Sequence, residues 1–213
     1  MGQKKVLMIG IKKEKKMSSR FEILLKIKAN KPDLLDLPII DETVFYEDID
    51  HISEFKKKVE IVGGNVFESS SNQDVINQVK SLYPSTALNF SVLEGTEAFN
   101  TIDLNTLKKP HDLVDLDVLI LKGTFGVAEN GAIWISDKQL LVRVLPFITK
   151  HLILVIKHSD IVPYLHQGYE LLKGKDNDFG VLLSGPSKTA DIEQSLVIGA
   201  QGALSLSVFL MQD

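Results

Sequence analysis

Three continuous apolar runs in the second half of the chain constrain its fold most strongly. They are Val118–Leu121, Leu152–Ile156 and Val181–Leu183. Uninterrupted apolar runs of this length are typical of strands that are covered on both faces. Helical patterns separate the runs, which implies right-handed crossovers and a mostly parallel sheet. We therefore expect an α/β fold, a three-layer sandwich around a mostly parallel central sheet.

Apolar residues that recur every three or four positions predict the helices of the chain. They indicate helices over residues 19–31, 52–62, 72–82, 140–145 and 160–173, and a further helix after Thr189. Further strands are expected at 65–68, 86–92 and 204–210. The last of these begins by alternating, which is typical of an edge or half-buried strand. Residues 33–48 read as a loop with a short extended piece at Thr43–Tyr46, and residues 94–114 are polar and irregular.

Composition bounds the fold and excludes several classes of protein. A chain of 213 residues with 44% apolar content can bury one sizeable core. The net charge of −4 argues against general nucleic-acid binding, and no apolar run is long enough to span a membrane. The chain has no cysteine, which excludes disulfides, thiolate zinc sites and cysteine-ligated iron–sulfur clusters. This composition fits a cytoplasmic protein.

The first 17 residues differ in charge from the rest of the chain. They carry six Lys and one Glu, a net charge of +5, which leaves −9 on the remaining residues. Met17 is followed by Ser18 and Ser19, a plausible helix start. We expect residues 1–17 to be a basic N-terminal appendage and residues 18–213 to form a single domain. The alternatives are that translation begins at Met17, or that the appendage is an arm for an acidic partner.

The segment Ser184–Glu193, with the sequence SGPSKTADIE, is the first candidate for a binding site. It follows an apolar run and precedes a helical pattern, so the expected order is strand, small-residue turn and helix. Gly185 permits close approach of the backbone to a ligand, and Pro186 stiffens the turn. Lys188 lies beside the free N–H groups of the next helical turn, which suit an anion. The alternative is a bare connection whose Ser, Thr and Asp residues only cap the helix.

A second glycine-containing loop, Lys122–Glu129, follows the apolar run that ends at Leu121. If this run and the run at 181–183 are parallel strands, both loops lie at the same edge of the sheet, where open α/β sheets bind ligands. Glu129 is the candidate for nucleophilic or acid–base chemistry. The alternative is that Asn130-Gly131 forms a type I′ hairpin turn and that Glu129 only flanks it.

Together these segments resemble the lactate-utilisation protein C family, also called LUD-domain proteins. The matching positions are Gly126–Gly131, Arg143, His151–Ile156, Gly185–Glu193 and Gly199–Gly202. Gln201 and Ala203 stand where this family has His and Pro. The resemblance implies the fold shared by ribose-phosphate isomerase, glucosamine-phosphate isomerase and coenzyme A transferases. It also makes Glu129 similar in context to the glutamate with which one class of coenzyme A transferases attacks an acyl thioester.

Glu129 is therefore the predicted catalytic residue, and the spacing of the His and acidic residues predicts no metal site. The predicted ligand-binding residues are Gly123, Gly126, Asn130, Gly131, Arg143, Ser184, Gly185, Pro186, Ser187, Lys188, Thr189 and Asp191.

Three hypotheses for function follow. In the first, which rests on the resemblance, the chain is an accessory or binding subunit of an iron–sulfur system that oxidises L-lactate. It holds a small anionic ligand at the 185–189 turn, carries no cofactor and acts beside iron–sulfur partner subunits. In the second, the chain is an autonomous enzyme of the isomerase and coenzyme A transferase fold group that uses Glu129 on a phosphorylated or CoA-linked metabolite. In the third, it is a sensor that binds a carboxylate or phosphate without chemistry.

Overall fold

A computed structural model describes residues 19–212 except 34, 37, 39–40, 48–49, 176–177 and 191–195. The chain divides into two compact units, residues 1–46 and residues 47–213. The predicted basic appendage, residues 1–17, lies outside the described residues, and a single domain over residues 18–213 stays a prediction.

The first unit contains α1 (Ser19–Ala29) and a short 3-10 helix (Glu42–Phe45). α1 is the first predicted helix, and none of its residues is buried. The 3-10 helix occupies the segment that was expected to be extended. The Asp41 carboxylate accepts hydrogen bonds from the backbone N–H and the hydroxyl of Thr43, at 3.1 and 2.5 Å, which favours a turn over a strand. The prediction of an extended piece at Thr43–Tyr46 is therefore wrong.

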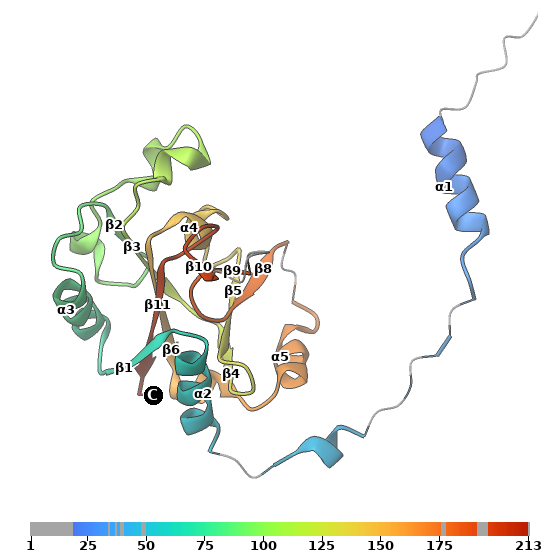
Figure 1. Cartoon of the computed structure of the whole chain (residues 1–213), viewed down its shortest axis with the longest axis horizontal. Coiled ribbons are helices and arrows are strands. Elements are labelled where there is room, and N and C mark those ends of the chain that lie inside the picture. Colours follow the sequence, from blue (N-terminus) through green and yellow to red (C-terminus); the bar gives the residue numbers. More distant parts are fainter. Residues whose placement is uncertain are drawn as a thin grey trace, which may run out of the picture. The chain divides into compact units, whose positions relative to one another are not determined.

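A five-stranded parallel sheet forms the centre of the second unit (Figure 1), in the order β1-β11-β6-β3-β2. The strands are β1 (Asn65–Ser69), β2 (Asn89–Ser91), β3 (Val118–Lys122), β6 (His151–Lys157) and β11 (Ser205–Met211). The predicted α/β fold with a mostly parallel central sheet is confirmed. β11 lies between β1 and β6, and its residues 206–210 are all buried. The prediction of an edge or half-buried strand at 204–210 is therefore wrong.

Alternate residues of the central strands point to opposite faces of the sheet and build two apolar cores. One core contains Ile120 of β3 and the inner residues of α3 (Asn72–Leu82). The other contains Leu119 and Leu121 of β3, the inner residues of α2 (His51–Ile61) and residues of a second sheet. The resulting layers are α3, the parallel sheet, and α2 with the second sheet; Figure 1 shows α3 and the second sheet on opposite sides of the parallel strands.

The second sheet has four strands in the order β7-β4-β5-β8. They are β4 (Phe125–Val127), β5 (Ala132–Ser136), β7 (Ile161–Val162) and β8 (Gly180–Leu183). β8 pairs with β5 in the antiparallel sense. The run at 181–183 thus forms a strand, as predicted, but it lies outside the parallel sheet. A β-carbon on Gly180 would lie 2.0 Å from the ring of Trp134, so glycine permits the close packing of β8 on β5.

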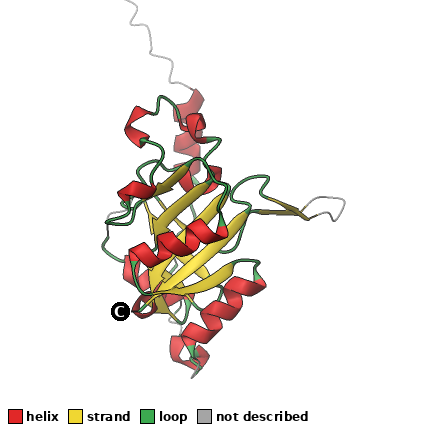
Figure 2. Ribbon diagram, turned by 90° about the vertical axis from the view of Figure 1, so that its left-hand side faces the viewer, coloured by secondary structure: helices red, strands yellow, loops and turns green. Residues whose placement is uncertain are grey.

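The segment after the 184–187 turn begins as a strand. β9 (Lys188–Ala190) and β10 (Leu196–Ile198) form a two-stranded antiparallel sheet, which projects from the rest of the unit in Figure 2. Thr189 pairs with Val197, and β-branched residues favour a pleated strand over a helix. The helix predicted after Thr189 is therefore wrong for the described residues 190 and 196–198.

Two other predicted helices differ from the observed ones. Residues 140–144 form bends and a turn at 143–144 rather than a helix, and α4 (Leu145–Ile148) is only four residues long. α5 (Leu165–Leu172) begins after Pro163 rather than before it. A residue that precedes proline is disfavoured in the α region, and Val162 accordingly lies in the extended strand β7.

Candidate functional site

The 184–189 turn contacts Asn130, which directly follows the predicted loop Lys122–Glu129, and Phe125–Val127 of that predicted loop form the strand β4. The Ser184 hydroxyl donates a hydrogen bond to the Asn130 carbonyl at 2.8 Å. The antiparallel register of β5 and β8 pairs Ile133 with Leu183, which places the end of β8 beside the start of β5. The expectation that both loops follow parallel strands of one sheet is therefore wrong.

The 184–188 turn lines a cavity of about 300 Å³, which we call the turn cavity. Its lining also includes Gln201–Ala203, from the segment that precedes β11. The Ser187 N–H donates to the Ala203 carbonyl, and the Gly199 N–H donates to the Ser187 carbonyl, both at 2.9 Å. Two segments that carry the family resemblance therefore converge on one cavity, at the amino ends of the neighbouring strands β6 and β11.

Lys188 is bound to the end of α2. Its Nζ donates a hydrogen bond to the carbonyl of Val62, which follows the last residue of the helix. Gly185 packs on the same carbonyl and has a φ of +75°. A β-carbon added at this position would lie 2.6 Å from the Val62 oxygen. An ammonium group has three N–H donors, so two remain for a ligand. Lys188 is thus the charged residue in the lining of the turn cavity, and no helix N-terminus follows it among the described residues, because Lys188–Ala190 form the strand β9.

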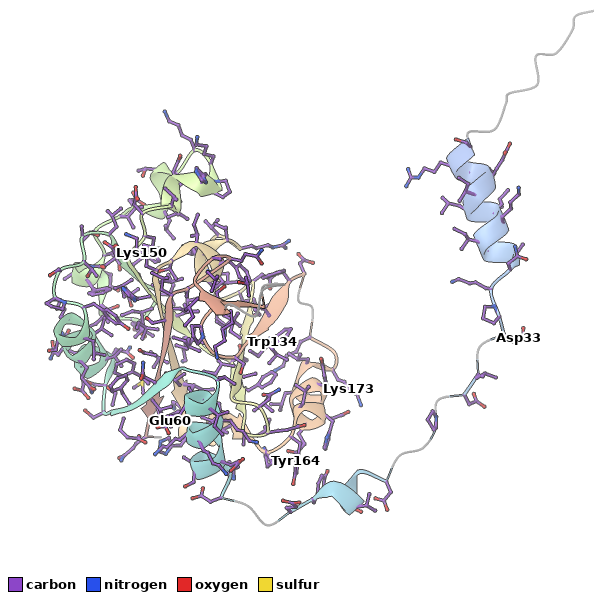
Figure 3. All side chains as sticks on the ribbon, viewed as in Figure 1. Asp33, Glu60, Trp134, Lys150, Tyr164 and Lys173 are labelled. Atoms are coloured by element: carbon purple, nitrogen blue, oxygen red, sulfur yellow. The ribbon has the colours of Figure 1, made fainter. Side chains whose placement is uncertain are left out.

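Glu129 serves as a cap for α5. Its Oε2 accepts a hydrogen bond from the backbone N–H of Leu165 at 2.9 Å, and its own N–H donates to the Pro163 carbonyl at 3.0 Å. Leu165 is the first residue of the helix and follows Tyr164, which is labelled in Figure 3. Glu129 is exposed and does not line the turn cavity. Its described contacts are those of a carboxylate that stabilises a helix N-terminus.

Asn130 and Gly131 complete the hairpin between β4 and β5. The Asn130 Oδ1 accepts from the Ala132 N–H at 3.0 Å, and the Gly131 N–H donates to the Val127 carbonyl at 2.9 Å. Since Val127 pairs with Ala132, four residues form the loop. The predicted hairpin is confirmed, whereas the predicted two-residue type I′ turn is wrong.

The remaining predicted site residues lie elsewhere. Gly123 and Gly126 are packed in the core, where a β-carbon would lie 2.5 Å from Ile133 and 3.1 Å from Phe55, respectively. The Thr189 hydroxyl donates to the Val197 carbonyl at 3.4 Å within the β9–β10 sheet. The Arg143 guanidinium stacks over the Phe179 ring, 5.3 Å from its centroid, and Pro186 is buried in the lining of the turn cavity. Asp191 lies outside the described residues.

A second cavity, which was not predicted from the sequence, lies at the carboxyl edge of the parallel sheet, and we call it the edge cavity. Its volume is about 330 Å³. It is lined by Asn72, Val92, Leu93, Glu94, Lys122, Val155, Ile156, Lys157 and Met211. A signal was present in the sequence, because a lysine directly follows the apolar residues of β3 and of β6.

Among the residues that the structure describes, there is neither a candidate metal site nor a candidate membrane-spanning helix. Nowhere in that part of the chain do three or more His, Cys, Asp or Glu side chains gather in a way that could hold a metal ion. Nor does that part contain a helix long and apolar enough to cross a membrane.

Relatives of the chain include lactate utilization proteins of bacilli. Lactate utilization protein C of Bacillus pumilus is 33% identical over 95 residues, which cover 42% of this chain and 40% of that protein. Lactate utilization protein C 1 of Bacillus mycoides is 29% identical over 129 residues, which cover 56% of this chain and 54% of that protein. The chain therefore spans about half the length, or less, of these relatives.

A solved structure has the same fold. The crystal structure of a DUF162 family protein from Deinococcus radiodurans aligns with a TM-score of 0.59 and 16% sequence identity, over 76% of this chain and 96% of that chain. Within the sequence, the family model of the LUD domain matches residues 52–211, which include both cavities. This match extends over most of the chain, and the chain therefore belongs to the LUD domain family.

Proposed function

We propose that this chain is a binding subunit of a lactate-utilisation system and that it holds a small anionic metabolite in the turn cavity. One observation carries the proposal: the 184–188 turn and the segment before β11, both of which resemble the lactate-utilisation proteins, line the same cavity. The relatives whose names refer to lactate utilisation support the choice of pathway.

The lining of the turn cavity favours a small monoanion. Lys188 is its single charged residue among those that the structure describes. Ser184, Ser187 and Gln201 add side chains that can donate and accept hydrogen bonds. One ammonium group with neutral polar neighbours matches one carboxylate with an adjacent hydroxyl or keto group, as in lactate or pyruvate. A nucleotide or coenzyme A ester would bring several phosphate charges, which call for more cations than this lining supplies.

In this proposal, partner subunits carry out the oxidation of lactate. The chain has no cysteine and so cannot provide thiolates to an iron–sulfur cluster. A subunit that binds the substrate or product beside cluster-bearing partners is consistent with that composition.

The autonomous-enzyme hypothesis has less support. A nucleophilic or basic Glu129 would need its carboxylate free to reach a substrate, whereas that carboxylate accepts a hydrogen bond from Leu165 and lies outside the turn cavity. The sensor hypothesis shares the ligand site of the main proposal and differs from it in having no oxidising partner.

Calorimetric titration of the full chain with L-lactate, pyruvate, acetate, inorganic phosphate and coenzyme A tests the proposed ligand. We expect L-lactate or pyruvate to bind, and Lys188→Gln to weaken that binding roughly tenfold through the loss of a charged hydrogen bond. The control is Lys108→Gln, which removes an exposed lysine outside both cavities. Equal affinities in the wild type and Lys188→Gln, or preferential binding of coenzyme A, would overturn the turn-cavity assignment.

Affinity purification from a lactate-grown host tests the partner. The co-purified material should contain iron and acid-labile sulfide in fixed proportion to the chain. If lactate binds but no cluster-bearing protein accompanies the chain, the sensor hypothesis replaces the binding subunit.

A further inference from the structure

We propose that the edge cavity is a second binding site, which takes a small organic anion with an apolar body. Its position supports this assignment. β3, β6 and β11 are parallel, and their last residues, Lys122, Lys157 and Met211, all line the cavity. Ligands of open α/β sheets bind beyond the carboxyl ends of such strands. The turn cavity lies at the opposite, amino ends of β6 and β11, so the two sites are distinct.

The pleat of the sheet directs the three terminal side chains to one face. Ile120 and Phe209 belong to the core beneath α3, and residues two positions further along a strand point the same way. Lys122, two residues after Ile120, and Met211, two residues after Phe209, therefore project toward the α3 side. Lys157, two residues after the buried Val155 of the same core, does likewise.

The residues that line the edge cavity carry a net positive charge. Its charged lining residues are Lys122, Lys157 and Glu94, a net charge of +1. Both lysines are exposed, and neither ammonium group forms an ion pair or hydrogen bond with any residue that the structure describes. This contrasts with Lys188, whose ammonium is bound to Val62. Two ammonium groups that line one cavity, against a single carboxylate, favour the binding of an anion there.

The start of α3 borders the cavity through Asn72. Asn72, the first residue of this 11-residue helix, donates from Nδ2 to the Glu94 carbonyl at 3.0 Å. The hydrogen bond ties the helix to the loop after β2.

The remaining walls determine the class of ligand. They are formed mainly by Val92, Leu93, Val155, Ile156 and Met211. A volume of about 330 Å³ lies at the lower end of the range for small-molecule sites. The ligand that fits these walls is a carboxylate or phosphate monoester whose uncharged part is a short alkyl chain or a single ring. The turn cavity, by contrast, favours a small hydrophilic anion.

Met211 provides a direct test, because the other three methionines of the chain are at positions 1, 8 and 17. The full chain is labelled with ¹³C at the methionine methyl groups, and the Met211 signal is assigned with Met211→Leu. The probes are hexanoate and phenyl phosphate, with hexanol as the uncharged counterpart of hexanoate. We expect saturable shifts of the Met211 methyl signal with at least one anion, and a much weaker response to hexanol.

Variants separate this site from the turn cavity. Lys122→Gln and Lys157→Gln should each weaken the anion's binding about fivefold or more. Lys80→Gln, at the other end of α3, and Lys188→Gln should leave it unchanged. The proposal is overturned if neither anion shifts the Met211 signal, if hexanol shifts it equally, or if Lys122→Gln and Lys157→Gln bind with wild-type affinity. Melting temperatures of all variants establish that each one is folded before the titration.

Discussion

The Nζ of Lys188 donates a hydrogen bond to the carbonyl oxygen of Val62, the residue that closes α2. This contact joins two segments 126 residues apart. Lysine near the carboxyl end of a helix satisfies one of the last unpaired carbonyls and interacts favourably with the helix dipole. The residue that the sequence singles out as an anion contact is thus also a helix cap, and its two roles can be separated experimentally.

Replacement of Lys188 by Gln should reduce stability as well as ligand affinity. A charged hydrogen bond to a helix end contributes about 1 kcal/mol, and a shorter neutral side chain restores only part of it. Urea unfolding without ligand should show this loss in Lys188→Gln and almost none in Lys173→Gln, because Lys173 is exposed and its ion pair with Glu170 lies at the surface. Equal midpoints for the wild type and Lys188→Gln would show that the Val62 contact does not stabilise the fold.

Glu129 should behave as a cap in a similar comparison. Glu129→Gln keeps an oxygen that can accept the Leu165 N–H, so it should lose a few tenths of a kcal/mol. Glu129→Ala leaves that N–H without its side-chain acceptor and should lose about 1 kcal/mol. Thermal unfolding should therefore rank the wild type first, then Gln, then Ala. Glu170→Ala on the outer surface of α5 is the control, and an Ala variant of Glu129 as stable as the wild type would contradict the capping role.

Gly185 and Gly174 allow backbone strain to be separated from steric overlap. Both have positive φ, +75° and +69°, which costs about 1 kcal/mol for alanine. An added β-carbon at Gly174 meets open space, whereas at Gly185 it would lie 2.6 Å from the Val62 oxygen. We expect Gly185→Ala to lower the free energy of unfolding by about 1 to 3 kcal/mol more than Gly174→Ala. Equal losses would mean that the turn can move away from α2 without cost.

Much of the fold could be predicted from local sequence because the pattern and the tertiary environment agree. The helices at 52–62 and 72–82 and the strands at 65–68, 118–121 and 152–156 all form. The strand at 204–210 also forms, but its position inside the sheet could not be read from its alternating start. That position depends on pairing with β1 and β6, which lie far away in the sequence.

The candidate site was predicted less well than the fold. The pairing of β8 with β5 and of β9 with β10 decides where the 184–188 turn lies, and a short apolar run does not show which sheet it joins. Lys188 and Glu129 carry charges that suit chemistry and capping equally, and only the geometry distinguishes the two uses. The lysines of the edge cavity come together because β3 and β6 are adjacent, which no local pattern reveals.

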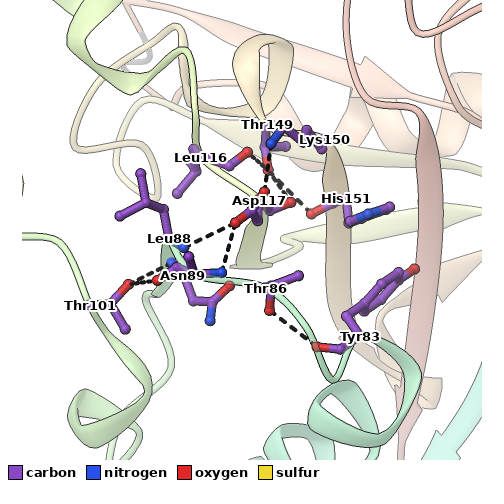
Figure 4. A network of polar contacts seen from close by, with 11 residues as sticks. Tyr83, Thr86, Leu88, Asn89, Thr101, Leu116, Asp117, Thr149, Lys150 and His151 are labelled. Atoms are coloured by element: carbon purple, nitrogen blue, oxygen red, sulfur yellow. Dashed lines mark hydrogen bonds and ion pairs between the residues drawn. The ribbon is translucent and has the colours of Figure 1, made fainter.

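Asp117 joins the amino ends of three neighbouring strands of the parallel sheet (Figure 4). Its Oδ2 accepts from the backbone N–H groups of Ala87 and Leu88, at 2.8 and 3.1 Å, just before β2. Its Oδ1 forms an ion pair with Lys150 at 2.7 Å, just before β6. Partial burial on its own would raise the pKa of Asp117. The hydrogen bonds from Lys150, Leu88 and Ala87 and the charge of Lys150 outweigh this effect and lower the pKa to about 2.

This lowered pKa makes stability depend on pH in acid. The unfolded chain binds a proton at Asp117 near its ordinary pKa of 3.8, while the folded chain stays ionised to about 2. The ionised carboxylate therefore contributes about 2 kcal/mol at neutral pH, which is fully present above about pH 5 and is lost as the pH falls toward 2. Asp117→Asn should be less stable than the wild type at pH 7 by about that amount, and the difference should shrink steadily between about pH 4 and pH 2. Urea unfolding across this range checks the prediction, with Asp115→Asn, an exposed neighbour, as the control. A difference between the wild type and Asp117→Asn that stays constant down to pH 2 would show that the three strand ends are not held together by this charge.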